Sequence, residues 1–222
     1  MKILVILPNL GGGGAEKVHI SLANNWVKNG HEVTICSGLI TPDSPFEIDK
    51  RINIIHLNCR KIRDLIFPLK KDIDDGLRKG PEIFPTGTPI TIKDGHCWFF
   101  GSIAHNSSEI FRVIDNQLNL GATHIKIMAS GGNFTPSSNP RISQYSFETI
   151  QETVNYCNNN NTYLCAHTLS RNSTIQCIES GVQNIIHGRW FDESTDKAYS
   201  FSEDYSKMIV DKGLFVDSTI SK

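Results

Sequence analysis

The chain has 222 residues, a formal net charge of −1, and hydrophobic and charged fractions of 39% and 20%, as expected of an ordinary globular protein with one large or two small domains. This balanced charge gives no overall electrostatic reason to expect nucleic acid or an anionic membrane as a partner. The six cysteines include no C-x-x-C pair, which favours free thiols in a reducing, cytoplasmic setting.

The first predicted element is a strand from Ile3 to Leu7. This apolar run is too short to span a membrane, and Pro-Asn-Leu-Gly follows it instead of a small-residue cleavage pattern. We therefore expect a strand, not a signal peptide or a membrane anchor. A continuous apolar run of this kind indicates a strand that is buried on both faces.

A glycine turn, a helix and two further strands follow. The turn is Gly11 to Gly14, Glu16 lies in the first helical turn, and Gly30 is placed to end the helix. The apolar residues at helical spacing are Val18, Leu22 and Trp26. With strands at His31–Cys36 and Ile52–Leu57, this order predicts a Rossmann-like β-α-β unit with a parallel sheet over residues 1–60.

Residues 61–80 differ in composition from what precedes them. The stretch is rich in charged residues and contains Pro68 and Gly76 as breakers. We interpret it as the junction between two domains. The alternative is a surface helix within one continuous domain.

Strand and helix patterns alternate again over residues 81–222. The predicted strands are Glu82–Thr86, His124–Ala129, Tyr163–His167, Asn184–His187 and Leu214–Ser218. The predicted helices carry apolar residues at Ile110, Ile114 and Leu118, at Phe147, Ile150 and Val154, at Ile175 and Ile178, and from Tyr205 to Ile209. Gly121 and Gly181 are placed to close two of them. About five strands predict an α/β fold that is part of a (β/α)8 TIM barrel, since a closed barrel needs eight, or else an open sheet.

Lys126 lies in the middle of the predicted strand His124–Ala129. Because side chains alternate along a strand, it lies on the face opposite to Ile125 and Ile127, and in a barrel it would point inward. A lysine inside a covered strand is costly unless it is paired or modified. The alternative is a side chain that extends to the strand end, where its charge reaches water.

Two consecutive predicted strands end in histidine, at His167 and His187. The active sites of barrels lie at the carboxyl ends of the strands, so the two imidazoles would meet at one rim. Imidazole is the commonest neutral ligand for zinc and similar ions. The pair therefore indicates a metal site, although a single histidine at a strand end is usually structural.

A family resemblance rests on several motifs, in order Gly95-His96-Cys97-Trp98, Gly121-Ala122, Ile125 to Gly132, Ala166-His167, Gly181-Val182 and Ile186-His187-Gly188. From about Asp74 to Ser218 the chain resembles the imidazolonepropionase-like branch of the amidohydrolase superfamily. The resemblance implies a hydrolase for C–N bonds of cyclic amide or amide-like small molecules.

The same resemblance implies a ligand set for a divalent metal, with zinc expected. Lys126 would be carboxylated to a carbamate and would bind the metal together with His167 and His187. A metal held in this way lowers the pKa of a bound water and polarises the scissile carbonyl. His96, Ser130 and Gly131 are candidates for substrate binding, against a structural role at the rim for His96 and a plain turn for Ser130 and Gly131.

The chain also departs from the family pattern. No H-x-H pair occurs in it, the aspartate of an eighth strand is missing after Lys222, and Ile186 stands where relatives often have glutamate. Loss of a proton-transfer residue costs about 10²–10⁴-fold in rate. These departures indicate impaired hydrolysis, or an inactive fusion or truncated product. The open edges of a partial barrel would allow homo-oligomers to form.

Residues 1–60 resemble something else. Ile3 to Pro8, Gly11 to Glu16 and Gly30 to Thr34 are similar to the start of a GT-B-type glycosyltransferase, which implies a nucleotide-sugar ligand. Gly12, Gly13 and Gly14 would then contact phosphate at a helix N-terminus, although tight packing also explains such a turn. The Glu-x7-Glu pattern of that family is absent, which argues against glycosyl transfer.

Overall fold

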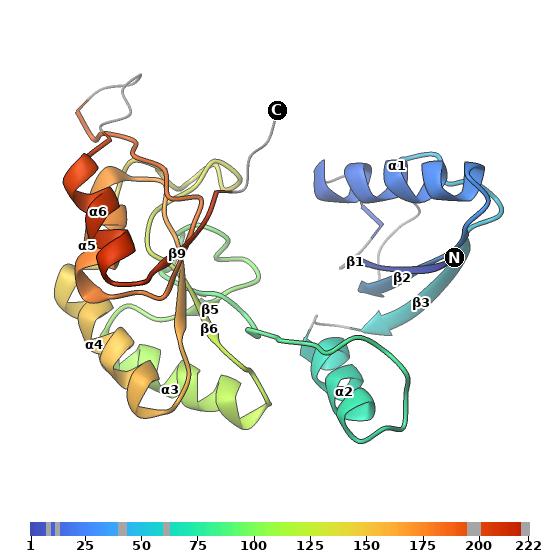
Figure 1. Ribbon diagram of the computed structural model, residues 1–222, viewed down its shortest axis with the longest axis horizontal. Coiled ribbons are helices and arrows are strands. Elements are labelled where there is room, and N and C mark those ends of the chain that lie inside the picture. Colours follow the sequence, from blue (N-terminus) through green and yellow to red (C-terminus); the bar gives the residue numbers. More distant parts are fainter. Residues whose placement is uncertain (8–9, 12–13, 40–43, 60–62, 195–200, 219–222) are drawn as a thin grey trace. The chain divides into compact units, whose positions relative to one another are not determined.

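The computed structural model of the chain describes residues 1–7, 10–11, 14–39, 44–59, 63–194 and 201–218 (Figure 1). These residues form two compact units, Met1–Ile83 and Phe84–Lys222. None of the helices in the described ranges is long and apolar enough to cross a membrane. The separate ancestry that we assign to residues 1–60 and 81–222 stays a prediction.

The first unit contains a parallel sheet with the expected strand-helix-strand order. Strands β1 (Lys2–Leu7) and β3 (Asn53–Cys59) both pair with the central strand β2 (Glu32–Leu39). Helix α1 (Gly14–Lys28) connects β1 to β2, and helix α2 (Arg63–Asp74) follows β3. The chain turns after α1 at Gly30 with φ of 80°, a left-handed conformation that glycine adopts without a steric cost.

The predicted burial of this unit is wrong in two respects. The inner face of α1 consists of Ile20, Ala23 and Val27. Of the predicted residues, Trp26 packs partly buried against this core, whereas Val18 and Leu22 are 57% and 42% exposed. Both sets have helical spacing, so periodicity alone could not choose between them. Strand β1 is also not buried on both faces: Leu4 and Ile6 are 58% and 41% exposed, while Val5 and Leu7 are buried.

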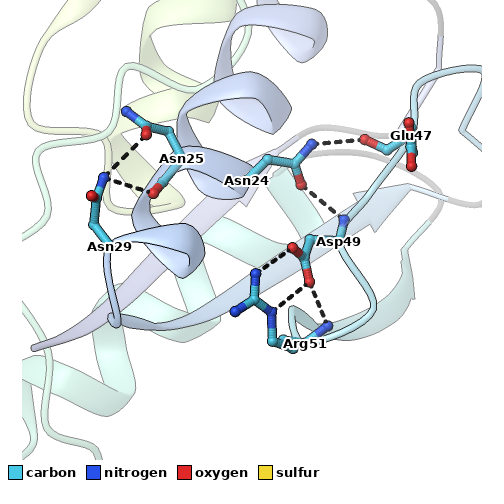
Figure 2. A network of polar contacts seen from close by, with 6 residues as sticks. All are labelled: Asn24, Asn25, Asn29, Glu47, Asp49 and Arg51. Atoms are coloured by element: carbon cyan, nitrogen blue, oxygen red, sulfur yellow. Dashed lines mark hydrogen bonds and ion pairs between the residues drawn. The ribbon is translucent and has the colours of Figure 1, made fainter.

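A polar network fixes the segment between β2 and β3 to helix α1 (Figure 2). The side chain of Asn24 donates to the carbonyl of Glu47 at 2.8 Å and accepts from the backbone N–H of Asp49 at 2.9 Å. The carboxylate of Asp49 in turn accepts from the backbone N–H and the guanidinium of Arg51, at 2.7 to 3.0 Å. The loop is therefore held by side chains where no strand or helix bonds are available.

The second unit is a parallel sheet with four helices packed on it, and in the described residues the strand order is β5-β4-β6-β7-β8-β9. The strands are β4 (Ile90–Thr91), β5 (Ser102–Ile103), β6 (Ile125–Met128), β7 (Leu164–His167), β8 (Asn184–Ile186) and β9 (Phe215–Asp217). The helices are α3 (Ser107–Asn119), α4 (Phe147–Asn159), α5 (Arg171–Ser180) and α6 (Glu203–Asp211). Each helix packs beside the next in chain order, and they cover one face of the sheet (Figure 1).

One predicted strand of this unit is wrong. Residues Glu82–Thr86 are irregular, and the first strand of the unit is β4, which begins four residues after Thr86. Pro85 has no N–H for a ladder bond, and Gly87 has φ of 72°, which is outside the strand region. The other four predicted strands correspond to β6, β7, β8 and β9, and a short edge strand, β5, was not expected.

The predicted helical faces of α3 and α4 are confirmed. Ile110 and Ile114 of α3 and Ile150 and Val154 of α4 are buried in one core. This core also contains the helix-facing residues of the strands, Ile90, Ile125, Ile127, Leu164, Ala166 and Ile185. The opposite face of the sheet carries the strand residues that alternate with these core residues, among them Lys126 and His167.

Candidate active site

The side chains that alternate with this core belong to the opposite face of the sheet. Met128, His167, Ile186 and Asp217 are paired in register across β6, β7, β8 and β9, at the carboxyl ends of these strands. One step earlier on the same face, Lys126 is paired with Cys165 and Cys165 with Asn184. The sheet thus brings Lys126 and His167 to one face, as the alternation predicts.

His167 and His187 lie together at the ends of β7 and β8. Their ring centroids are 4.8 Å apart and the ring planes are at 82°. His167 is buried, and its Nε2 lies 3.1 Å from the carbonyl oxygen of Gly131. A carbonyl only accepts, so Nε2 carries the proton and the lone pair of neutral His167 is on Nδ1.

His187 takes an uncommon backbone conformation directly after β8. Its φ is 71°, in the left-handed region where histidine is one of the better tolerated non-glycine residues. Its backbone N–H donates to the carbonyl of Asp217 at 2.7 Å, so β9 fixes the position of His187. The half-buried imidazole turns toward His167.

Both of these imidazoles are neutral at pH 7. Burial, together with the nearby His96 and Lys126, lowers the pKa of His167 to about 2. Burial and the charge of Lys126 also lower the pKa of His187. A neutral imidazole is the form that binds a metal.

Lys126 is partly buried, and burial lowers the pKa of its ammonium to about 8. Among the described residues, none forms an ion pair or hydrogen bond with it. Close by on the sheet, the side-chain oxygen of Asn184 is buried and forms no hydrogen bond with the part of the chain that the structure describes. A buried polar atom without a partner is costly, and Asn184 lies on the same face of the sheet as Lys126.

His96 joins the two strand-end histidines. It is buried in the loop after β4, and its ring centroid lies 4.4 Å from that of His167 with the planes 30° apart. The hydroxyl of Thr135 lies 3.3 Å from Nδ1 of His96. Burial lowers the pKa of His96 to about 4, so a third neutral imidazole lies at the same place.

Ser130 and Gly131, the other predicted substrate-binding residues, follow β6. The buried hydroxyl of Ser130 donates to the carbonyl of Gly131 at 2.8 Å and accepts from the N–H of Leu169 at 2.9 Å. The N–H of Gly131 donates to the carbonyl of Ile142. In this structure both residues stabilise the loop beside His167 through these hydrogen bonds. Substrate binding by them stays a prediction.

The predicted phosphate loop is described only in part. Gly12 and Gly13 lie outside the described residues, and Gly14 is the first residue of α1. Phosphate binding there stays a prediction. Within the described ranges, no three or more His, Cys, Asp and Glu side chains are arranged to hold a metal ion, so the predicted metal site depends on Lys126 as a third donor.

Sequence reasoning missed an aromatic group beside His96. Trp98, Phe99, Phe100 and Phe134 are between 42% and 67% exposed, and Phe99 contacts each of the other three rings at centroid distances of 5.0 to 6.4 Å. We call these four residues the aromatic patch. The run Trp98-Phe99-Phe100 directly after the Gly-His-Cys motif was the signal that could have found it.

Sequence reasoning also missed Gln144. Its side chain bonds to the backbone of His96, 48 residues earlier in the chain. No periodicity or motif indicates a bond between an isolated glutamine and a loop so distant in sequence.

Comparison with known proteins gives no family model that matches the chain, but it finds relatives among amidohydrolases. Ochratoxinase from Aspergillus niger is 26% identical over 148 residues, which cover 55% of this chain and 31% of ochratoxinase. The chain thus spans about a third of the curated relative that it matches. The comparisons give no support to the glycosyltransferase resemblance of residues 1–60.

Solved structures support the fold. The crystal structure of A. niger ochratoxinase aligns with a TM-score of 0.59 and 19% identity, over 92% of this chain and 45% of that one. A prolidase complexed with N-methylphosphonate-L-proline aligns with a TM-score of 0.59 and 19% identity, over 97% of this chain and 51% of that one. A Xaa-Pro dipeptidase aligns with a TM-score of 0.61 and 14% identity, over 98% of this chain and 52% of that one. The chain therefore has an α/β fold like that of amidohydrolase TIM-barrel proteins and spans about half of these structures.

Proposed function

We propose that the chain carries the site of a metal-dependent amidohydrolase that cleaves the C–N bond of an amide. The observation that carries this proposal is the pair His167 and His187, two neutral imidazoles with ring centroids 4.8 Å apart at the ends of adjacent parallel strands. The names of the similar proteins, among them ochratoxinase and a Xaa-Pro dipeptidase, support amide hydrolysis.

The donor set fits a divalent metal if Lys126 is carboxylated. Its ammonium is partly buried without an ion pair from the described residues, and a carbamate would replace that charge by oxygen donors. Lys126, His167 and His187 would then hold the ion. When bound, the metal supplies an activated water and polarises the amide carbonyl.

The other residues of the site exclude water and orient the substrate. His96 and His167 are both buried. The carbonyl of Gly131, in the loop after β6, accepts from the Ser130 hydroxyl at 2.8 Å and lies 3.1 Å from Nε2 of His167. We assign substrate contact to His96, and the contact of its ring with that of His167 supports this assignment. The role of a neutral imidazole there is to donate or accept one hydrogen bond.

The aromatic patch favours an apolar group on the substrate. Clustered exposed apolar side chains mark binding surfaces more often than isolated ones do, and Cys97, which precedes the patch, donates its N–H to the same Thr135 hydroxyl that lies against His96. An amide with an aromatic or aliphatic substituent would place that substituent on the patch and its carbonyl near His96.

Metal content and hydrolysis test the proposal. Protein incubated with zinc and bicarbonate, then desalted, should retain about one metal ion per chain and hydrolyse N-acyl amino acids that carry an aromatic side chain. The variants Lys126→Ala, His167→Asn and His187→Asn should lose the metal. The matched control is His124→Asn, because His124 stacks on Tyr163 at the opposite end of β6. Full retention of metal in the first three variants would contradict the proposal.

A further inference from the structure

Gln144 is bonded on three sides by groups from different parts of the second unit. Its Oε1 accepts from the backbone N–H of His96 at 2.6 Å. Its Nε2 donates to the carbonyl of Met128 at 2.7 Å and to the hydroxyl of Thr91 at 3.2 Å. A side chain with all of its amide groups engaged has little rotational freedom, and so it acts as a rigid link.

The bonds converge on one residue. While Gln144 holds the N–H of His96, the hydroxyl of Thr91 donates to the carbonyl of His96 at 2.9 Å. Thr91 itself is completely buried in β4. Both backbone groups of His96 are therefore fixed by two side chains that also bond to each other.

The room for this arrangement depends on a glycine. A Cβ built on Gly95 would lie 2.6 Å from Oε1 of Gln144 and 2.9 Å from Oγ1 of Thr91, which is closer than real Cβ contacts. The loop after β4 thus leaves no room for a side chain at position 95 beside Gln144 and Thr91. Because β4 ends at Thr91, strand pairing does not reach His96, and its backbone is fixed by the side chains of Gln144 and Thr91.

We propose that Gln144 is a positioning residue: its side chain holds the backbone of His96 so that the imidazole stays beside that of His167. The effect on catalysis rests on the proposed function, whereas the effect on the position of His96 does not. Gln144 itself contacts no reacting group in this proposal. It acts only through His96.

Long-range ¹H–¹⁵N spectra of the histidine rings in the full chain test the position directly. Gln144→Leu keeps the size of the side chain and removes its three bonds, so the ring signals of His96 and His167 should move. The matched control is Gln151→Leu, because Gln151 also bonds through its amide, to Asn155 and Ser180, but away from His96. Unchanged His96 signals in folded Gln144→Leu would overturn the proposal.

Two further measurements complete the test. If Gln144→Leu does not fold, the same spectra are recorded for Thr91→Val, because valine has nearly the shape of threonine but cannot bond to Gln144 or His96. A shift of the His96 ring signals in this variant supports the proposal, and unchanged signals overturn it. In protein that hydrolyses amides, folded Gln144→Leu should lose at least about ten-fold in kcat/KM while Gln151→Leu keeps it. If the wild-type protein binds no metal and hydrolyses no amide, the proposed function is refuted. The histidine spectra would still test whether Gln144 positions His96, because they need neither metal nor activity.

Discussion

The imidazole of His96, in the loop after β4, lies 4.4 Å from the imidazole of His167 at the end of β7. The strand between them, β6, is followed by Gly132, and a Cβ built there would lie 2.3 Å from Cε1 of His96. The absence of a side chain at position 132 therefore allows the two rings to meet across an intervening strand.

Gly132→Ala should destabilise the protein by about 1–3 kcal/mol, because the new methyl group overlaps the His96 ring and displaces it. Denaturant unfolding measures this change in the free energy of unfolding. The control is the same substitution in a His96→Ala background, where the ring is gone and the cost should be smaller. An equal cost in both backgrounds would show that the contact with His96 is not its cause.

Lys126→Met should stabilise the protein when neither metal nor bicarbonate is present. The substitution keeps the length of the side chain and removes a partly buried charge that forms no ion pair with the described residues, so we expect a gain of roughly 1 kcal/mol or more. Thermal unfolding with and without bicarbonate is the measurement. A melting temperature below that of the wild type without bicarbonate would contradict the expectation.

The aromatic patch should affect substrate affinity more than the stability of the fold. Phe99→Ser removes the ring that contacts Trp98, Phe100 and Phe134, and we expect KM for amides with a large apolar substituent to rise several-fold. For an N-acetyl amide with a small substituent KM should not change. An equal rise for both substrates would argue against the patch as the apolar subsite.

Asp49→Asn should change how stability depends on pH. Hydrogen bonds from the side chain and the backbone of Arg51 hold the pKa of the Asp49 carboxyl well below its usual range. A carboxyl with a lowered folded-state pKa stabilises the fold above its unfolded value of about 3.9, and this contribution is lost as the pH falls below it. The melting temperature of the wild type should therefore drop more steeply below pH 4 than that of Asp49→Asn. Parallel curves would contradict this.

Asn106→Ala should lower the free energy of unfolding by about 1 kcal/mol, because the side chain of Asn106 caps helix α3. Its Oδ1 accepts from the backbone N–H of Glu109 at 3.0 Å. Asn106→Asp keeps the acceptor and should retain wild-type stability in urea unfolding. A loss as large as that of alanine would show that the cap bond is not responsible.

The strand ends of the site could be predicted because each depends on local information. His167 and His187 follow short apolar runs, and Lys126 alternates with Ile125 and Ile127 in β6. A sequence pattern of period two was therefore sufficient to place Lys126 and His167 on one face. The register between β6, β7 and β8 then follows from parallel pairing. Whether these three residues bind a metal is untested and stays a prediction.

The rest of the site depends on contacts between distant segments. His96 reaches His167 through the bonds of Gln144 and Thr135, and neither residue belongs to a periodic pattern. The same limit explains the wrong face of α1: Ile20 and Leu22 are both apolar and lie on different sides of the helix, and only the position of the sheet determines that Ile20 is buried.

The left-handed backbone of His187, with φ of 71°, has a consequence for mutational scanning. Glycine and asparagine tolerate this conformation, whereas valine and isoleucine resist it because their Cβ is branched. In a saturation library at position 187, we therefore expect three kinds of outcome. The protein with histidine folds and binds metal, the variants with glycine or asparagine fold but do not bind metal, and the variants with β-branched residues are expressed at a lower level. Selection for solubility and selection for activity would then report different properties of one residue, the first its backbone and the second its imidazole.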